Sequence, residues 1–130
     1  MVRDSILGSG TLVAFIPTTD RARARTFYEG VLGLRLTSDD PPFAAVFDAN
    51  GTMLRVTAVQ EHHPAPFTVL GWEVASIEAT VQSLMAAGVE FLRYPDLNDE
   101  SPLGIWASPS GARIAWFHDP DKNVLSLTQF

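Results

Sequence analysis

Two charged side chains, Arg55 and Glu73, are the residues of this sequence whose type and setting best suit ligand recognition. Each lies on a predicted strand face that is otherwise largely apolar, where an unpaired charge is unfavourable. A guanidinium there would bind a carboxylate or phenolate through its fork of donors. The carboxylate could bind a ligand amine or act as a general base. The alternative is that the two side chains pair with each other or reach solvent.

Few other groups could hold a metal or act as nucleophiles. The chain has no cysteine, which excludes disulfides, thiolate metal sites and cysteine nucleophiles. His62 and His63 lie in a proline-containing segment and are expected to be solvated, and His118 is expected to be exposed or capped at a hairpin. The sequence around Gly8 opens no helix and lacks the pattern of a phosphate loop. No serine has the surroundings of a nucleophile elbow.

The elements that must position these residues follow a strand–helix–strand–strand–strand pattern that occurs twice. Residues 47–59 align without a gap with residues 118–130, and residues 12–17 match residues 68–74. The second copy is longer, with the extra residues around 96–110. Because a repeat determines the architecture, we predict a single domain with module one over about 11–59, a linker over 60–66 and module two over about 67–130. We expect the two modules to meet across one shared cleft.

Capping and turn residues delimit the predicted elements. In module one, a strand over 11–18 precedes the N-cap Asp20, the helix ends near Gly33, and strands over 34–38, 43–47 and 53–59 follow, with a hairpin at Asn50-Gly51. In module two, a strand over 67–74 precedes a helix from Ser76 to Gly88, then short strands over 89–93 and 105–107 and a hairpin over 112–117 and 124–129. This pattern predicts an α+β domain with helices on one face of a curved sheet.

Composition is that of an ordinary globular domain, with 130 residues, 46% hydrophobic and 18% charged. No apolar run approaches the roughly 18 residues that a membrane span needs. Residues 1–8 lack the long apolar core of a secretory signal, so we expect a cytoplasmic protein. The net charge of −6 argues against nucleic acid and anionic membranes as partners, since both require a basic face.

Strand alternation separates two faces of the predicted sheet. The nearly wholly apolar face, expected beneath the helices, carries Leu12, Ala14, Ile16, Leu54, Val56, Leu70, Trp72, Val74, Leu125 and Leu127. The opposite face has the mixed composition of a small-molecule pocket, and we predict ligand binding by Val13, Phe15, Met53, Arg55, Val69, Glu73, Ser126 and, from the 96–110 loop, Trp106. Plain packing is the alternative for Phe15 and Met53. Trp106 is either a lid or an anchor for its loop, and the side on which Trp116 lies is left open.

Three segments carry a resemblance to a known family. They are residues 20–34, with Phe27-Tyr28 and Leu32-Gly33-Leu34; residues 74–89; and residues 111–127, with Asp119-Pro-Asp-Lys-Asn. Over nearly the whole chain they resemble the vicinal oxygen chelate superfamily, the group of glyoxalase I, bleomycin-resistance proteins and extradiol dioxygenases. The resemblance implies two βαβββ modules that form a curved mixed sheet, or half-barrel, around one cleft. Lys122 departs from it, because relatives usually have glycine in this turn.

Metal-dependent relatives hold a divalent ion with His, Gln or Glu from the first and last strands of each module. The resemblance places the four ligand positions at Val13, Arg55, Val69 and Ser126. None of these side chains is a good ligand for a divalent transition metal, and an arginine would repel it. We therefore expect a metal-free member without a cofactor.

The resemblance thus favours a metal-independent small-molecule-binding protein of the bleomycin-resistance type, sequestering an aromatic or antibiotic-like ligand. Such relatives are dimers with clefts shared between chains, so a homodimer is expected. The alternative is an enzyme of the superfamily (an isomerase, a lyase or a dioxygenase-like protein) that uses Glu73 as base or a metal site elsewhere. A third interpretation is a degenerate domain that binds another protein.

Overall fold

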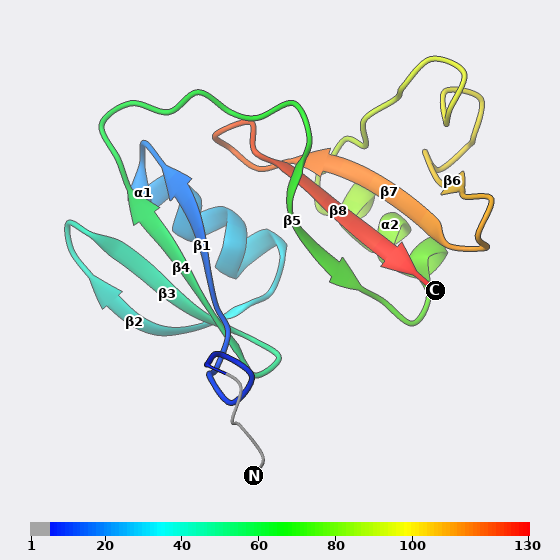
Figure 1. Cartoon of the computed structure of the whole chain (residues 1–130). Helices are drawn as coiled ribbons and strands as arrows, with labels where there is room; N and C mark the ends of the chain where they lie inside the picture. The colour runs from blue at the N-terminus through cyan, green and yellow to red at the C-terminus, as the bar shows by residue number, and fades with distance from the viewer. Residues whose placement is uncertain (1–5) are drawn as a thin grey trace, which may run out of the picture.

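A computed structural model describes residues 6–130 of the chain (Figure 1). The N-terminal segment considered above for a secretory signal lies largely outside the described residues. Module one contains β1 (Val13–Thr18), α1 (Arg21–Arg25), the π-helical segment η1 (Thr26–Val31), β2 (Arg35–Asp40), β3 (Ala44–Ala49) and β4 (Thr52–Ala58). Module two contains β5 (Thr68–Glu73), α2 (Ile77–Ala86), β6 (Trp106–Ala107), β7 (Arg113–His118) and β8 (Val124–Gln129).

Each module forms its own four-stranded mixed sheet. The strand orders are β1-β4-β3-β2 and β5-β8-β7-β6, with β1 parallel to β4, β5 parallel to β8 and the remaining pairs antiparallel. The helix of each module links its first strand to the rest and lies behind the sheet in the view of Figure 1. This is the α+β architecture of two βαβββ modules that the repeat predicts.

The helix boundaries follow from local hydrogen bonding. Asp20 caps α1 by accepting a hydrogen bond from the backbone N–H of Arg23, and Ser76 caps α2 by accepting one from Ala79. The helical segment of module one is followed by Gly33 with a φ of 75°, the left-handed conformation that glycine adopts most easily. The predicted caps and stop are therefore confirmed.

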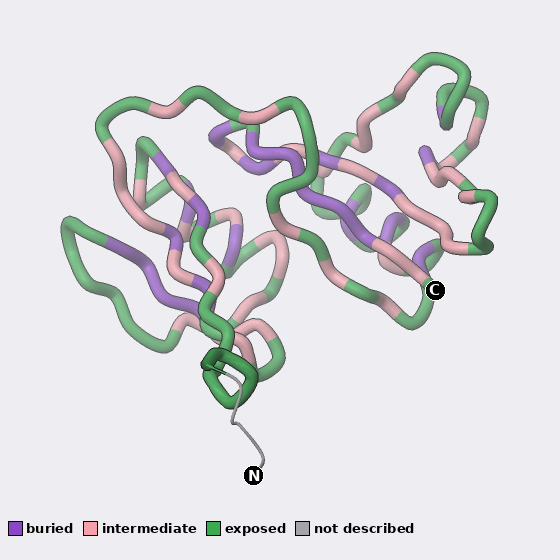
Figure 2. The backbone as a smooth tube through the Cα atoms, in the orientation of Figure 1, coloured by how far each residue is buried: buried purple, intermediate pink, exposed green. Residues whose placement is uncertain are grey.

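The hydrophobic core lies between each sheet and its helix. It contains Ile16, Ala24, Tyr28, Ala45, Phe47, Leu54, Val56, Ile77, Val81, Leu84, Ala115, Phe117, Leu125 and Leu127. Figure 2 shows buried stretches along β3 and β8, each of which is one of the two inner strands of its sheet. The prediction that the apolar face lies beneath the helices is confirmed except at Leu12. Leu12 is 74% exposed because it precedes β1, which begins at Val13.

The turn between β7 and β8 joins the two modules. Asp119 accepts a hydrogen bond from the Tyr28 hydroxyl at 2.7 Å, and Asp121 accepts hydrogen bonds from the Thr18 hydroxyl and the Thr19 backbone N–H. Burial and the neighbouring Asp119 carboxylate raise the pKa of Tyr28 above its ordinary value, so its hydroxyl stays protonated and donates. A turn of module two is thereby held against the beginning of the module-one helix.

The segment after α2 differs from the prediction, because residues 89–93 do not form a strand. Only an isolated bridge joins Phe91 to Phe117. Beyond it, the Asn98 side-chain amide donates to the carbonyls of Leu92 and Gly104, and the Arg93 guanidinium donates to the carbonyl of Ser101. A side chain thus satisfies the Leu92 carbonyl of the predicted strand, and the other two carbonyls belong to the loop that follows. No helix within residues 6–130 has the length and apolarity to span a membrane.

Candidate functional site

The predicted ligand-binding residues of module one form an apolar surface on the front of the first sheet. The parallel register of β1 and β4 places Val13 beside Met53 and Phe15 beside Arg55. Their side chains share one face because strand residues alternate. Phe15 is 65% exposed, Met53 43% and Val13 38%. These apolar side chains pack beneath no helix, so this face is open to a ligand or to another chain.

Arg55 stands at the centre of this surface, between Phe15 on β1 and Val46 on β3. Within residues 6–130 its guanidinium makes no hydrogen bond and no ion pair, although the residue is half-buried. Every other arginine of that range has a polar partner: Arg21 and Arg25 pair with Asp39, Arg23 with Asp121, Arg35 with Asp48 and Arg113 with Glu78, and Arg93 donates to loop carbonyls. Arg55 is thus a guanidinium with its donors available, set among apolar side chains.

The proposed pairing of Arg55 with Glu73 is not seen. The two residues lie in different sheets, and Glu73 is exposed at the end of β5. Glu73 lines a cavity of about 220 Å³ together with Trp72, Val74, Leu34 and other mostly apolar residues. The structure therefore separates the two charges that the sequence could not place relative to each other.

The second sheet presents a different surface on the equivalent face. Ser126 on β8 pairs with Gly71 on β5 and with Trp116 on β7. A Cβ at position 71 would lie 2.6 Å from the Ser126 Oγ, so glycine permits this close approach. Val69, at the irregularity where the β5–β8 register shifts, is exposed. In this sheet the ligand-position residues are small or apolar.

An aromatic cluster covers part of this second face. Trp106 stacks on Trp116 with ring centroids 6.1 Å apart, and Tyr94 contacts Trp116 edge to face at 5.3 Å. Trp116 therefore lies on the Ser126 side of its sheet, which the sequence alone left open. The pairing of Trp116 with Ser126 shows on which face of the sheet Trp116 lies. The sequence does not reveal this pairing, because it depends on the register between β7 and β8. The stacking holds Trp106 against β7, and both predicted alternatives for Trp106, a lid or an anchor for its loop, are compatible with this position.

The four positions where relatives hold a metal are divided between the two sheets, with Val13 and Arg55 in the first and Val69 and Ser126 in the second. Two aliphatic side chains, a guanidinium and a hydroxyl do not form a donor set for a divalent cation. In the described part of the chain, no three His, Cys, Asp or Glu side chains gather where they could hold a metal ion.

The histidines have separate roles. The His62 Nε2 lies 2.6 Å from the Asn123 Oδ1, so His62 ties the linker to the β7–β8 turn and is not merely solvated. His118 is partly buried at the end of β7. Burial lowers the pKa of His118, the nearby Lys122 ammonium lowers it further, and Asp119 opposes both effects. The His118 imidazole is therefore neutral near pH 7.

Comparisons with known proteins give a consistent assignment. A family model described as Glyoxalase/Bleomycin resistance protein/Dioxygenase superfamily matches residues 10–127. Similar solved structures include lactoylglutathione lyase from Agrobacterium tumefaciens (TM-score 0.73, 16% identity, 93% of each chain covered). TioX from Micromonospora sp. ML1 has a TM-score of 0.71 at 19% identity, covering 93% of this chain and 98% of that one.

A member of the same superfamily from Sphaerobacter thermophilus has a TM-score of 0.72 at 21% identity, covering 96% of this chain and 100% of that one. No curated protein sequence matches this chain. At these identities the solved structures support the fold alone.

Proposed function

Because this chain belongs to the glyoxalase/bleomycin resistance protein/dioxygenase superfamily, we propose that it is a metal-independent member that binds a small aromatic anion. The observation that carries this proposal is Arg55, a half-buried guanidinium without a polar partner in residues 6–130. A carboxylate, sulfonate or phenolate would supply the missing acceptor. The exposed side chains of Phe15 and Met53 flank Arg55 and would cover the aromatic body.

The physical chemistry of this surface favours such a ligand over a simple inorganic anion. A guanidinium is only weakly hydrated and offers a planar fork of N–H donors that matches a carboxylate. An aromatic ring laid against Phe15 adds apolar burial at about 25 cal/mol per Å². Charge sets the orientation of the ligand in this arrangement, and the apolar contacts supply most of the affinity.

The same residues explain why we propose binding without a metal. Val13 and Val69 offer no donor atom, and a cation beside Arg55 would meet a positive charge without a neutralising carboxylate. The enzyme alternative with Glu73 as base has less support, since Glu73 lies in the other sheet and is exposed to water.

We further propose that the protein acts as a homodimer with binding clefts shared between the chains. Val13, Phe15 and Met53 leave an apolar surface exposed on the first sheet, and Val69 and Phe67 do so on the second module. Contiguous exposed apolar side chains on a folded protein commonly mark an interface or a ligand site. A second copy placed over this face would turn an open surface into a cleft.

Two related dyes test the binding proposal. 8-Anilinonaphthalene-1-sulfonate carries an anionic group, and N-phenyl-1-naphthylamine has the same aromatic frame without it. We expect Arg55→Ala to weaken binding of the sulfonate by about tenfold, the value of one lost charge-assisted interaction. Binding of the uncharged dye should change little, as should binding of either dye to the control variant Arg35→Ala. Fluorescence titration measures all three proteins.

Loss of both dyes in Arg55→Ala, or of neither, would contradict the role of Arg55. Native mass spectrometry of gently purified protein tests the rest of the proposal. A dimer mass without a stoichiometric divalent ion is the expected result. A bound divalent ion would overturn metal independence, and a monomer would overturn the shared cleft.

A further inference from the structure

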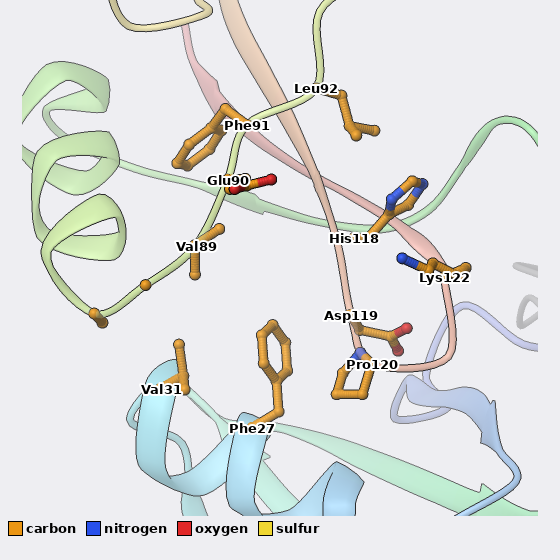
Figure 3. Close-up of a pocket in the computed structure, with 12 residues that line it drawn as sticks. Phe27, Val31, Val89, Glu90, Phe91, Leu92, His118, Asp119, Pro120 and Lys122 are labelled. Atoms are coloured by element: carbon orange, nitrogen blue, oxygen red, sulfur yellow. The ribbon is translucent and has the colours of Figure 1, made fainter.

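A second hollow, separate from the Arg55 surface, lies between the two modules on their helix side (Figure 3). Its volume is about 400 Å³, within the range of small-molecule sites. Module one contributes Phe27 and Val31 from η1. Module two contributes residues 87–92, which follow α2, and the β7–β8 turn with His118 and Lys122. None of the residues proposed above to bind the aromatic anion lines this hollow.

The walls carry opposite charges on opposite sides. In Figure 3 the Glu90 carboxylate and the Lys122 ammonium both point toward the interior, and the Phe27 ring projects into the hollow from below, beneath Glu90. Within the described residues, neither charge has a hydrogen bond or an ion pair through its side chain. Asp119 also lines the hollow, but its carboxylate is engaged by Tyr28 and Asn123.

Exposed charges often lack partners, so the backbone of Lys122 is the more telling observation. Its φ is 65°, in the left-handed region where a long L side chain is disfavoured and glycine is not. The aligned position of the first module's turn holds Gly51, with a φ of 94°. Lys122 is also the only lysine of the chain. Lys122 thus keeps a long, charged side chain at the rim of the cavity in a backbone conformation that glycine adopts more easily.

The polarity of the lining indicates the kind of ligand. A carboxylate of the ligand would bind the Lys122 ammonium, and the neutral His118 imidazole beside it can donate a further hydrogen bond. An ammonium of the ligand would bind Glu90 on the facing wall. Phe27 and the other apolar side chains, namely Val31, Val89, Phe91 and Leu92, would surround an apolar body.

We propose that this hollow is a binding site for a small amphoteric molecule, an α-amino acid with an apolar or aromatic side chain. Lys122 binds its carboxylate, Glu90 binds its ammonium, and Phe27 contacts its side chain. The site is distinct from the Arg55 surface, so its occupancy does not depend on the function proposed above.

The single lysine makes the site directly observable. Reductive methylation with ¹³C-formaldehyde labels Lys122 and the terminal amine, and the spectrum of Lys122→Gly assigns the two signals. We expect L-phenylalanine to shift the Lys122 signal saturably. Calorimetry on unmodified protein then compares L-phenylalanine with 3-phenylpropanoate, which lacks the ammonium, and with phenethylamine, which lacks the carboxylate. Each is expected to bind at least about tenfold more weakly than L-phenylalanine.

The variants separate binding from folding. Lys122→Gly suits the left-handed turn, so its melting temperature should equal or exceed that of the wild type while L-phenylalanine binding is lost. Glu90→Gln should lose affinity for L-phenylalanine but keep affinity for 3-phenylpropanoate, and the control Glu61→Gln, an exposed linker residue, should behave as wild type. No shift of the Lys122 signal at about 10 mM L-phenylalanine, or equal binding of the three compounds, would overturn the proposal.

Discussion

The last hairpin turns of the two modules align in sequence but have opposite surroundings. The turn between β3 and β4 contains Asn50 and Gly51, both exposed, and one hydrogen bond from the Gly51 N–H to the Asp48 carboxylate. In the turn between β7 and β8, Asp119 and Asp121 are buried against module one. A shared chain path therefore does not imply shared contacts.

The difference lies in what each turn contacts. The β7–β8 turn reaches the end of β1 and the beginning of α1, where Thr18 and Thr19 present donors that Asp121 accepts. The β3–β4 turn contacts no such donors, and the N-terminus of α2 is satisfied by Gln129, which accepts from the Ile77 N–H. Only one of the two turns can hold the modules together, and it also carries Lys122 into the cavity between them.

The largest expected effect is that of removing the buried carboxylate. Asp119→Ala deletes an acceptor shared by Tyr28, Asp121 and Asn123 and leaves a buried hydroxyl without a partner. We expect the free energy of unfolding to fall by about 3 kcal/mol or more. Asp48→Ala, the aligned change in the exposed turn, should cost about 1 kcal/mol or less. Urea unfolding measures both, and equal losses would refute the asymmetry between the turns.

A second, intermediate effect is the loss of folding stability at low pH. Burial alone would raise the pKa of Asp121, but hydrogen bonds from Thr18 and Thr19 and the charge of Arg23 outweigh it and hold the pKa below its ordinary value. As the pH falls, the Asp121 carboxylate is therefore protonated in the unfolded chain before it is protonated in the folded protein. The ionised carboxylate stabilises the fold above about pH 4, and this contribution is lost as the pH falls further.

The Asp121→Asn variant should therefore lose less stability than the wild type when the pH is lowered from about 5 to about 2.5, although it is less stable at neutral pH. Urea unfolding at a series of pH values measures the slope. Asp48→Asn, the aligned change in the exposed turn, is measured beside it for comparison. An unchanged slope in Asp121→Asn would show that other carboxyl groups carry the acid sensitivity.

The smallest effect contrasts two aligned threonines of the final strands. The Thr57 hydroxyl on β4 is buried and has no hydrogen-bond partner among the described residues. The aligned residue on β8, Thr128, is partly exposed to water. Thr57→Val should raise the free energy of unfolding by about 1 kcal/mol, because the unsatisfied hydroxyl is replaced by a methyl group. Thr128→Val should change it little. Thermal unfolding compares the two, and a loss in Thr57→Val would mean that the hydroxyl has a partner in solution.

Much of the fold could be predicted because its signals are local. Alternation located the buried residues of β1 and β4, and capping residues located both helices. The prediction of a strand over 89–93 was wrong. The Asn98 side-chain amide takes the Leu92 carbonyl, which strand pairing would have used, and such competition is not visible in an apolar pattern.

The candidate site was predictable only in part. The face that carries Val13, Phe15, Met53 and Arg55 follows from alternation and is present as expected. The Arg55 guanidinium has no polar partner within residues 6–130. This could not be predicted, because the alternation of residues along a strand does not show which carboxylates of other elements lie near it. The position of Trp116 beside Trp106 depends on register across β7, and no turn residue reveals that register.

The sequence by itself determined the repeated order of elements, the faces of the strands and the residue types at the four ligand positions, because these depend on neighbours along the chain. Only the tertiary structure decided that Arg55 and Glu73 lie apart, that Asp119 and Asp121 dock on module one, and that Lys122 faces Glu90 across a hollow. These relations join residues far apart in sequence. They arise from burial and hydrogen bonding between packed modules, which local propensities do not encode.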